Sequence, residues 1–321
     1  MIHPSQFPDR AADDLAVSLR SRSINHKFHY DTVKQANQWV RIHRAFSPAV
    51  TDPGCAGIYE AACHAAAGQI PPGRAEVVGL GCGSGWKDAV LLRALAGRGV
   101  RTVYWAVDSS APMTLIARQN TTPEAKLLVC DLASPLGVPA ELVIRGAASE
   151  TRIVTFYGML PNFEPDRILP VLASMLREED ILLFSANLAP GRDYLEGARS
   201  VLPLYDNAPT RAWLMIFLLD LGFEEGDGEL RFSIRSDTAN EGLLRIEAVF
   251  VLGRSREITV AGEVFRFERD ESIRLFFSYR HTPERVRSAF VRYGMEIEGE
   301  WINATGEEGV FLARKRGAGL A

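Results

Sequence analysis

The stretch AEVVGLGCGSGWKDAVLL, residues 75–92, decides the fold. It opens with a short apolar run that ends in glycines, which predicts a buried strand running into a tight turn. The helical spacing of apolar residues over 87–97 predicts that a helix follows directly. A glycine-rich turn before a helix N-terminus lets the backbone approach a ligand closely. We therefore expect a ligand site at Gly81, Gly83 and Gly85.

Downstream of this stretch, apolar runs continue to alternate with helical patterns. The expected strands are 75–81, 102–108, 126–132, 152–160 and 180–188, and the expected helices between them include 110–119 and 165–176. Such alternation is typical of a parallel sheet with helices on both faces. The predicted fold class is therefore α/β.

The pattern changes after Pro190. Residues 191–221 have helical spacing, and 228–277 alternate apolar and polar residues between Gly or Asn, as antiparallel strands do. A helix at 283–293 and a final strand pair complete the chain. We expect two domains. The ranges 50–190 and 280–321 form the cofactor-binding domain, and 1–49 and 191–279 form an added α+β substrate-recognition domain.

Composition narrows the class of protein. A net charge of −4 with no basic stripe argues against nucleic acid as the substrate. The four cysteines fit neither a zinc pattern nor a disulfide framework, so we expect no metal and free thiols in a reducing cytosol. The start of the chain lacks a signal-peptide pattern, and the longest apolar run, 213–219, is too short to span a bilayer. We expect a cytoplasmic protein, a monomer or weak homodimer, with no membrane partner.

The glycine spacing indicates the cofactor. Dinucleotide sites read G-x-G-x-x-G, whereas this loop reads G-x-G-x-G at 81, 83 and 85, which favours S-adenosylmethionine. Asp108 closes the second strand, where a carboxylate accepts hydrogen bonds from a ribose. Asp131 and Leu132 lie at the end of the third strand, where we expect them at the adenine amine and ring. All lie at carboxyl ends of strands, where open α/β sheets bind ligands.

Three other functions compete with a small-molecule methyltransferase. A dinucleotide-dependent oxidoreductase is opposed by the glycine spacing and the terminal strand pair. A binder of S-adenosylmethionine without catalysis would be excluded by turnover of any acceptor. A nucleic-acid methyltransferase draws some support from Pro161-Asn162-Phe163, but the charge balance opposes it.

The chain resembles the histidine Nα-methyltransferase family of ergothioneine biosynthesis along nearly its whole length. The motifs that carry the resemblance are FHYDTV (28–33), GLGCGSGWKDAVLL (79–92), AVDSSAPM (106–113), YGMLPNFEP (157–165), LYDN (204–207) and FSYRHTPERV (277–286). The resemblance implies a class I, Rossmann-like methyltransferase sheet and S-adenosyl-L-methionine as cofactor, with S-adenosyl-L-homocysteine as product. It also implies that Lys87, Ser109 and Tyr157 help to bind the cofactor.

The resemblance also assigns acceptor residues. The counterparts of Asn162 and Tyr205 hold the substrate's carboxylate, and the counterpart of Tyr30 lies close to the reacting amine. We therefore expect Tyr30 to take part in catalysis, through a bound water that relays the proton.

The departures from the family concern the acceptor's ring. The family holds the imidazole with a glutamate and a serine, which fall here on Phe276 and Ser278, and with a tyrosine that falls on Phe46. Trp213 lies where the family has another aromatic residue. An apolar site disfavours a ligand that needs hydrogen bonds. The acid that usually ends the first strand is replaced by Gly79, which affects the detail of cofactor binding and not the cofactor class.

The sequence thus predicts a methyltransferase of secondary metabolism that acts on an aromatic amino acid, amine or indole derivative rather than histidine. N-methylation of an amine and C-methylation of an indole remain open at this point. C-methylation of an indole needs a base to remove the ring proton. His43 and His281 lie in segments expected to border the pocket, although histidines at such positions more often have only a packing role.

Overall fold

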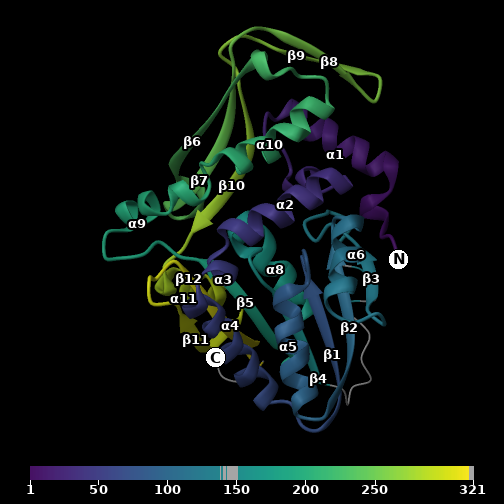
Figure 1. Ribbon diagram of the computed structural model, residues 1–321, viewed down its shortest axis with the longest axis vertical. Helices are drawn as coiled ribbons and strands as arrows, with labels where there is room; N and C mark the ends of the chain where they lie inside the picture. The colour runs from purple at the N-terminus through teal and green to yellow at the C-terminus, as the bar shows by residue number, and fades with distance from the viewer. Residues whose placement is uncertain (138, 140–141, 143–150, 318–321) are drawn as a thin grey trace.

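The computed structural model describes residues 1–137, 139, 142 and 151–317. Its main sheet has seven strands in the order β11-β12-β5-β4-β1-β2-β3 (Figure 1). The strands are β1 (Gly73–Leu80), β2 (Val100–Asp108), β3 (Lys126–Val129), β4 (Thr151–Phe156), β5 (Ile181–Asn187), β11 (Met295–Ile302) and β12 (Glu308–Lys315). β1 to β5 run parallel, and β12 joins β5 antiparallel. This is the α/β class that the alternating pattern predicts.

The strand order reverses at β1, which pairs with β2 on one side and β4 on the other. Open α/β sheets bind ligands at the carboxyl ends of the strands beside such a reversal. The glycine loop follows β1 and therefore lies at this position.

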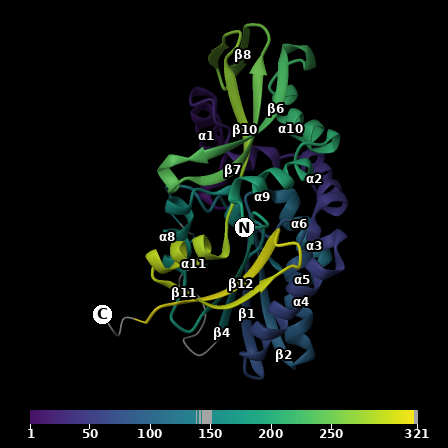
Figure 2. The ribbon, with the colours of Figure 1, turned by 90° about the vertical axis from the view of Figure 1, so that its left-hand side faces the viewer.

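Helices cover both faces of the sheet (Figures 1 and 2). One face packs on α4 (Pro53–Gly68), α5 (Trp86–Gly97) and α6 (Ala111–Asn120), and the other on α8 (Pro165–Met175) and α11 (Pro283–Arg292). The two faces form separate apolar cores, as expected for parallel strands that are buried on both sides.

A second layer lies above the carboxyl ends of the main sheet (Figure 1). It contains a three-stranded antiparallel sheet in the order β10-β7-β6 and a hairpin of β8 and β9. The elements are β6 (Gly228–Asp237), β7 (Leu243–Leu252), β8 (Arg256–Val260), β9 (Glu263–Phe267), β10 (Ser272–Arg280), α1 (Pro8–Arg20), α2 (Val33–Phe46), α9 (Tyr194–Ser200) and α10 (Ala208–Asp220). Its own apolar core joins α1, α10 and the two small sheets. The short helix α3 (Pro48–Thr51) links α2 to α4, and its Ala49 is buried in the core of the main sheet.

The N-terminal arm connects the two layers. Ile2 bridges Val129 in parallel, so the first residues extend the edge of the main sheet beside β3. Helix α1 then crosses to the second layer, where Leu19 is buried in the upper core.

Two strands end earlier than their apolar runs predict. β3 stops at Val129 instead of residue 132, and Asp131 lies in a turn where its carboxylate accepts the N–H of Ala133. β4 stops at Phe156 instead of residue 160 because Gly158 has a positive φ of 69° and Leu160–Asn162 form a 3-10 turn. Both differences place polar side chains at the end of the sheet. No helix within the described residues is long and apolar enough to cross a membrane.

Candidate active site

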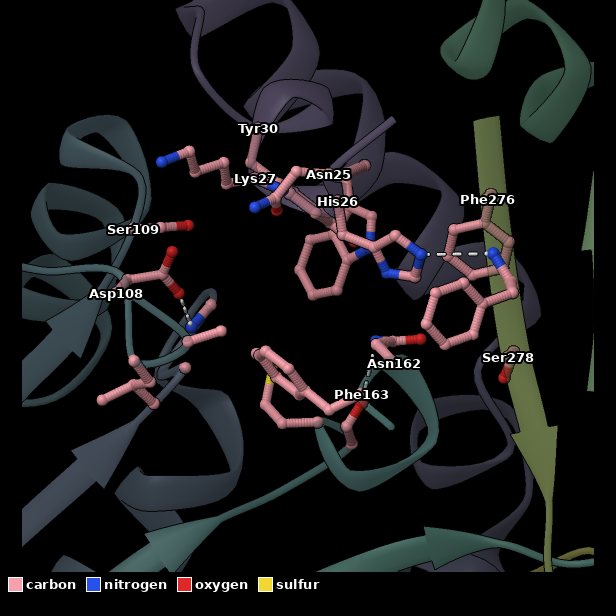
Figure 3. A pocket seen from close by; sticks show the side chains of 18 of the residues that line it. Asn25, His26, Lys27, Tyr30, Asp108, Ser109, Asn162, Phe163, Phe276 and Ser278 are labelled. Carbon is pink, nitrogen blue, oxygen red and sulfur yellow. Dashed lines mark hydrogen bonds between the residues drawn. The ribbon is translucent and has the colours of Figure 1, made fainter. Parts of the chain in front are cut away.

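A cavity of about 780 Å³ lies between the main sheet and the second layer. Fifteen of the residues predicted for the site line it, from both layers. They are Tyr30, Phe46, Gly81, Gly83, Lys87, Asp108, Ser109, Asp131, Leu132, Tyr157, Asn162, Tyr205, Trp213, Phe276 and Ser278. Figure 3 shows the cavity between the Asp108 side and the β10 side. Its volume falls in the range of small-molecule sites.

Gly85 is the predicted cofactor residue that does not line the cavity. It has a φ of 73° and caps the N-terminus of α5, and an added Cβ would lie 2.9 Å from the Cα of Ala117. Its glycine therefore lets α5 and α6 approach each other, and that it also holds the cofactor stays a prediction. Gly81 does face the cavity, and a Cβ there would lie 2.5 Å from Met159.

Asp108 organises the glycine loop at the end of β2. One carboxylate oxygen accepts the N–H of Gly83 at 3.0 Å, and the other accepts the N–H of Ser110 at 3.0 Å. Burial raises the pKa of Asp108 to about 6. Asp108 lines the cavity, and a carboxylate has further lone pairs that can accept hydrogen bonds from the hydroxyls of a ribose (Figure 3). The loop and this carboxylate thus suit the nucleoside part of S-adenosylmethionine.

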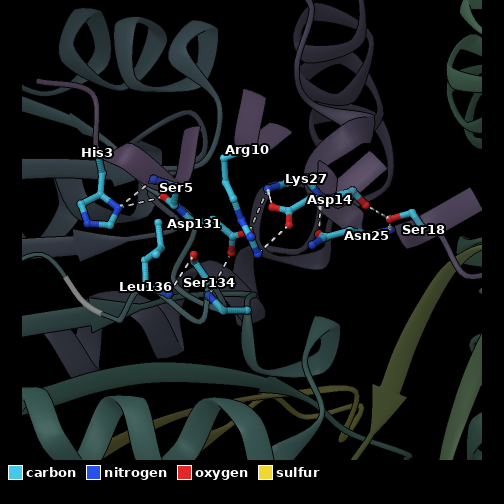
Figure 4. A network of polar contacts seen from close by, with 11 residues as sticks. His3, Ser5, Arg10, Asp14, Ser18, Asn25, Lys27, Asp131, Ser134 and Leu136 are labelled. Carbon is cyan, nitrogen blue, oxygen red and sulfur yellow. Dashed lines mark hydrogen bonds and ion pairs between the residues drawn. The ribbon is translucent and has the colours of Figure 1, made fainter. Parts of the chain in front are cut away.

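Asp131 belongs to a polar network with the N-terminal arm (Figure 4). Lys27, which is 7% exposed, lies 3.1 Å from Asp131 and 2.7 Å from Asp14. Arg10 in turn pairs with Asp14 at 2.9 Å. The sequence alone did not indicate this contact between Lys27 and Asp131. An adenine amine at Asp131 would share the carboxylate with the lysine.

Lys87 extends from the first turn of α5 into the cavity wall. Its ammonium lies 2.7 Å from the hydroxyl of Tyr59 and 3.4 Å from a carboxylate oxygen of Glu308. Tyr157 also reaches the cavity, but its hydroxyl lies 3.4 Å from the sulfur of Cys63. Lys87 therefore brings a positive charge to the cavity beside Tyr59 and Glu308. The hydroxyl of Tyr157 instead contacts Cys63 of helix α4.

Tyr30 lies where the two layers meet. The hydroxyl of Ser110 donates to the backbone oxygen of Tyr30 at 2.6 Å, which ties the segment to the end of β2. The Tyr30 ring contacts Trp39 and Trp213, with centroids 5.8 and 5.3 Å away. Burial, with the nearby Asp108, raises the pKa of Tyr30, so its phenol stays protonated at neutral pH. It is suited to donate a hydrogen bond and not to act as a base.

A cluster of polar side chains lines the part of the cavity where we expect the acceptor, which we call the acceptor side. The hydroxyl of Tyr205 accepts from Arg280 at 2.8 Å and from Asn187 at 2.9 Å, and lies 3.1 Å from the hydroxyl of Ser278. The family assigns Tyr205 to the carboxylate and Ser278 to the ring, yet here the two residues are in contact. Asn162 lies in the turn after β4, and its amide donates to the oxygen of Gly158 at 3.3 Å.

Arg280 is a residue that the sequence analysis missed. It is 3% exposed and lines the cavity; its guanidinium donates to the backbone oxygen of Leu188 and to the hydroxyl of Tyr205, and none of the described carboxylates forms an ion pair with it. Its Nε is buried without a hydrogen-bond partner. A buried cation normally pairs with an anion. Its position two residues after Ser278, on the same face of the strand, is the signal that could have indicated it.

His26 is the second missed residue. Its ring stacks on Phe276 with a centroid distance of 4.9 Å and an interplanar angle of 17°, and its Nε2 accepts the N–H of Phe277 at 3.2 Å (Figure 3). Burial, together with His29 and Arg274, lowers its pKa well below 6.5. A neutral imidazole of this chain therefore covers the face of Phe276. Only its place just before FHYDTV could have drawn attention to it.

The two histidines considered as bases differ in position. His43 lines the cavity and stacks on Trp39, and burial with the nearby Lys87 lowers its pKa to about 3. His281 is buried outside the lining, and burial with the nearby Arg280 lowers its pKa to about 3. Neither is basic enough to accept a proton readily at neutral pH. Among the described residues, no group of three or more His, Cys, Asp or Glu side chains could hold a metal.

Several solved structures resemble this chain distantly. An S-adenosylmethionine-dependent methyltransferase from Clostridium acetobutylicum has 13% identity and a TM-score of 0.46, covering 88% of this chain and 99% of its own. The 1,6-didemethyltoxoflavin-N1-methyltransferase of Burkholderia thailandensis has 14% identity and a TM-score of 0.44, with coverage of 89% and 88%. Magnesium protoporphyrin IX methyltransferase from Synechocystis has 13% identity and a TM-score of 0.41, with coverage of 87% and 93%.

These similarities are too distant to assign a function, and no curated protein sequence matches the chain significantly. The family profile is informative. The profile described as histidine-specific methyltransferase, SAM-dependent, matches residues 13–315. The match spans both layers and every residue that the sequence predicted for the site. The chain therefore belongs to the family of histidine-specific, S-adenosylmethionine-dependent methyltransferases and is a small-molecule methyltransferase.

Proposed function

We propose that the acceptor is an aromatic amino acid, such as one with an indole ring, and not histidine. The proposal places the enzyme in secondary metabolism. It assigns the carboxylate of the acceptor to the polar cluster and the ring to the aromatic wall above it.

The charge of the acceptor side carries this proposal. The cavity-lining residues from α10 to β10 include Arg274 and Arg280 and no carboxylate. Because Arg280 has no described anionic partner, a ligand carboxylate beside Tyr205 would balance its charge. An amine without a carboxylate would instead bring a further cation to a region that already contains Arg274 and Arg280. An amino acid is therefore favoured over the corresponding decarboxylated amine.

The ring end of the cavity supports an apolar ring. Trp213 and Tyr205 contact Phe276 with centroids 6.2 and 6.1 Å away, and Phe46 lines the same cavity. Where the family uses a glutamate for the imidazole, Phe276 offers no hydrogen-bond acceptor. The imidazole N–H of a bound histidine would lose its partner there, which a hydrogen-bonding ligand tolerates poorly.

The chain's own residues supply alignment and proton handling. S-adenosylmethionine, when bound, supplies the electrophilic methyl group. Asn162 and Tyr205 would fix the acceptor's carboxylate and so place the adjacent amine near the cofactor side. Tyr30, which keeps its proton, would orient the amine by accepting a hydrogen bond from one of its N–H groups, and a bound water would take the proton that the amine releases.

A panel of acceptors with labelled S-adenosylmethionine tests the proposal. We expect methylation of tryptophan or another aromatic amino acid, slower reaction of tryptamine, and none of histidine. Product mass and fragmentation separate methylation of the amine from methylation of indole carbon 3. Conversion of histidine to its trimethylated form would overturn the argument from Phe276. Equal rates for tryptophan and tryptamine would overturn the role given to Arg280.

A further inference from the structure

Besides Asp108, a second buried carboxylate lies next to the start of the glycine loop, at Gly79. Asp88, in the first turn of α5, is 3% exposed and lines the same cavity as Gly81 and Lys87. It points back towards β1, where a Cβ added to Gly79 would lie 2.6 Å from its Oδ2. The carboxylate therefore fills the space that a side chain at Gly79 would occupy. It is supplied by the helix after the loop instead of the strand before it.

The partners of Asp88 are neutral. The hydroxyl of Tyr104 donates to Oδ2 at 2.7 Å, and that of Thr155 donates to Oδ1 at 2.5 Å. No cation of the described residues lies within ion-pair distance of Asp88, and the ammonium of the adjacent Lys87 is bound to Tyr59 and Glu308 instead. Two hydroxyls orient a carboxylate but do not balance its charge. Burial accordingly raises the pKa of Asp88 to about 6.

The cavity therefore holds a buried anion whose counter-ion the described part of the chain does not provide. S-adenosylmethionine carries an α-ammonium group at its methionine end, and a buried charge is stabilised by pairing. We propose that Asp88 binds and orients this ammonium group, from helix α5, in the place left open by Gly79. The inference concerns the cofactor and holds whichever acceptor the enzyme uses.

Calorimetric binding provides the test, because it needs neither an acceptor nor turnover. S-adenosylhomocysteine and its analogue without the α-amino group are titrated into wild type and Asp88→Asn. We expect the variant to lose roughly 30-fold or more in affinity for S-adenosylhomocysteine and little for the analogue. Equal losses for both ligands would mean that Asp88 only supports the loop, and no loss would refute the contact.

A reciprocal variant guards against misfolding of Asp88→Asn. Gly79→Asp combined with Asp88→Ala returns a carboxylate to the same space from β1. We expect it to regain part of the affinity for S-adenosylhomocysteine, whereas the control Gly79→Ala with Asp88→Ala does not. Equal affinities of these two double variants, both with cooperative thermal unfolding, would contradict the proposal.

The pH dependence of binding gives an independent readout. The titratable groups electrostatically coupled to Asp88 are Lys87 on its own helix, Tyr104 on β2, Cys82 in the loop, Cys63 on α4 and Tyr157 after β4. Burial raises the pKa of each thiol and phenol in this set, so none ionises between pH 5 and 7. As the pH falls below 6, protonated Asp88 loses its attraction for the ammonium, and affinity drops. Asp88→Asn should lack this share of the pH dependence, and an unchanged profile would count against the proposal.

Discussion

The two sides of the cavity are built in different ways. The cofactor side comes from the loop after β1 and the ends of β2 and β4, and its polar groups hold one another in place, as Asp108 holds Gly83. The acceptor side comes from η2 (His26–His29), α2, α10 and β10, which lie far apart in the chain. It combines stacked aromatic rings with Arg280, whose Nε has no partner. On the cofactor side the hydrogen bonds of the loop are thus made without ligand, but the charge of Asp88 lacks a partner among the described residues. On the acceptor side, Arg280 lacks both a counter-ion and a partner for its Nε within the same part of the chain.

Because the two sides are built from different elements, affinity for the cofactor and selectivity for the acceptor can change independently. A contiguous motif that satisfies its own hydrogen bonds can remain unchanged while distant residues change around it. Phe276 and His26 lie against each other on the acceptor side, 250 positions apart in the sequence. Substitutions on one side should therefore leave binding on the other side largely intact.

The largest effect is expected at the loop itself. Gly85→Ala forces a side chain into a left-handed conformation and against the backbone of Ala117. Strain and overpacking together should lower the free energy of unfolding by about 3–5 kcal/mol and weaken S-adenosylhomocysteine binding. Thermal unfolding and calorimetry measure both effects. The control Gly97→Ala, in the same helix with open space around it, should be neutral or stabilising by up to about 1 kcal/mol. A free energy of unfolding equal to that of the wild type for Gly85→Ala would contradict this assignment.

Arg280→Met should affect the acceptor side alone. The substitution keeps much of the apolar stem and removes the cation that donates to Tyr205. We expect the KM of a carboxylate-bearing acceptor to rise roughly 30-fold, with S-adenosylhomocysteine affinity unchanged, because the truncated partner leaves a carboxylate unpaired. Steady-state kinetics and calorimetry separate the two quantities. A parallel loss of cofactor affinity would show that the two sides are coupled.

The smallest effect is expected when the family's ring contact is restored. Phe276→Glu alone places a carboxylate against His26, which should hold the new charge before any ligand does. We therefore expect little gain of histidine binding from the single change. The double change with His26→Ser should raise histidine affinity about 10-fold, since the carboxylate is then free to accept from an imidazole. Calorimetry with histidine measures this difference, and an equal gain in the single variant would show that His26 does not cover the ring site.

The sequence by itself determined the parallel sheet, the cofactor loop and the position of Asp108. Strands, glycine turn and helix are local patterns, and their order places strand ends together at one edge of a sheet. Local patterns did not place Phe46, Trp213 and Phe276 at the acceptor; the resemblance to the family did. The family resemblance added the residues expected to hold the acceptor.

Only the tertiary structure decided which groups touch. Spacing in the loop could not show that Gly85 faces Ala117 and not the cavity, because that depends on how α5 packs on α6. It could not show that Asp88 fills the place beside Gly79, or that His26 covers Phe276. These contacts join different elements or distant segments, and side-chain packing across elements has no signature in a local pattern. The charge balance of Arg280 and Asp88 is of the same kind, since pairing depends on every neighbour in space.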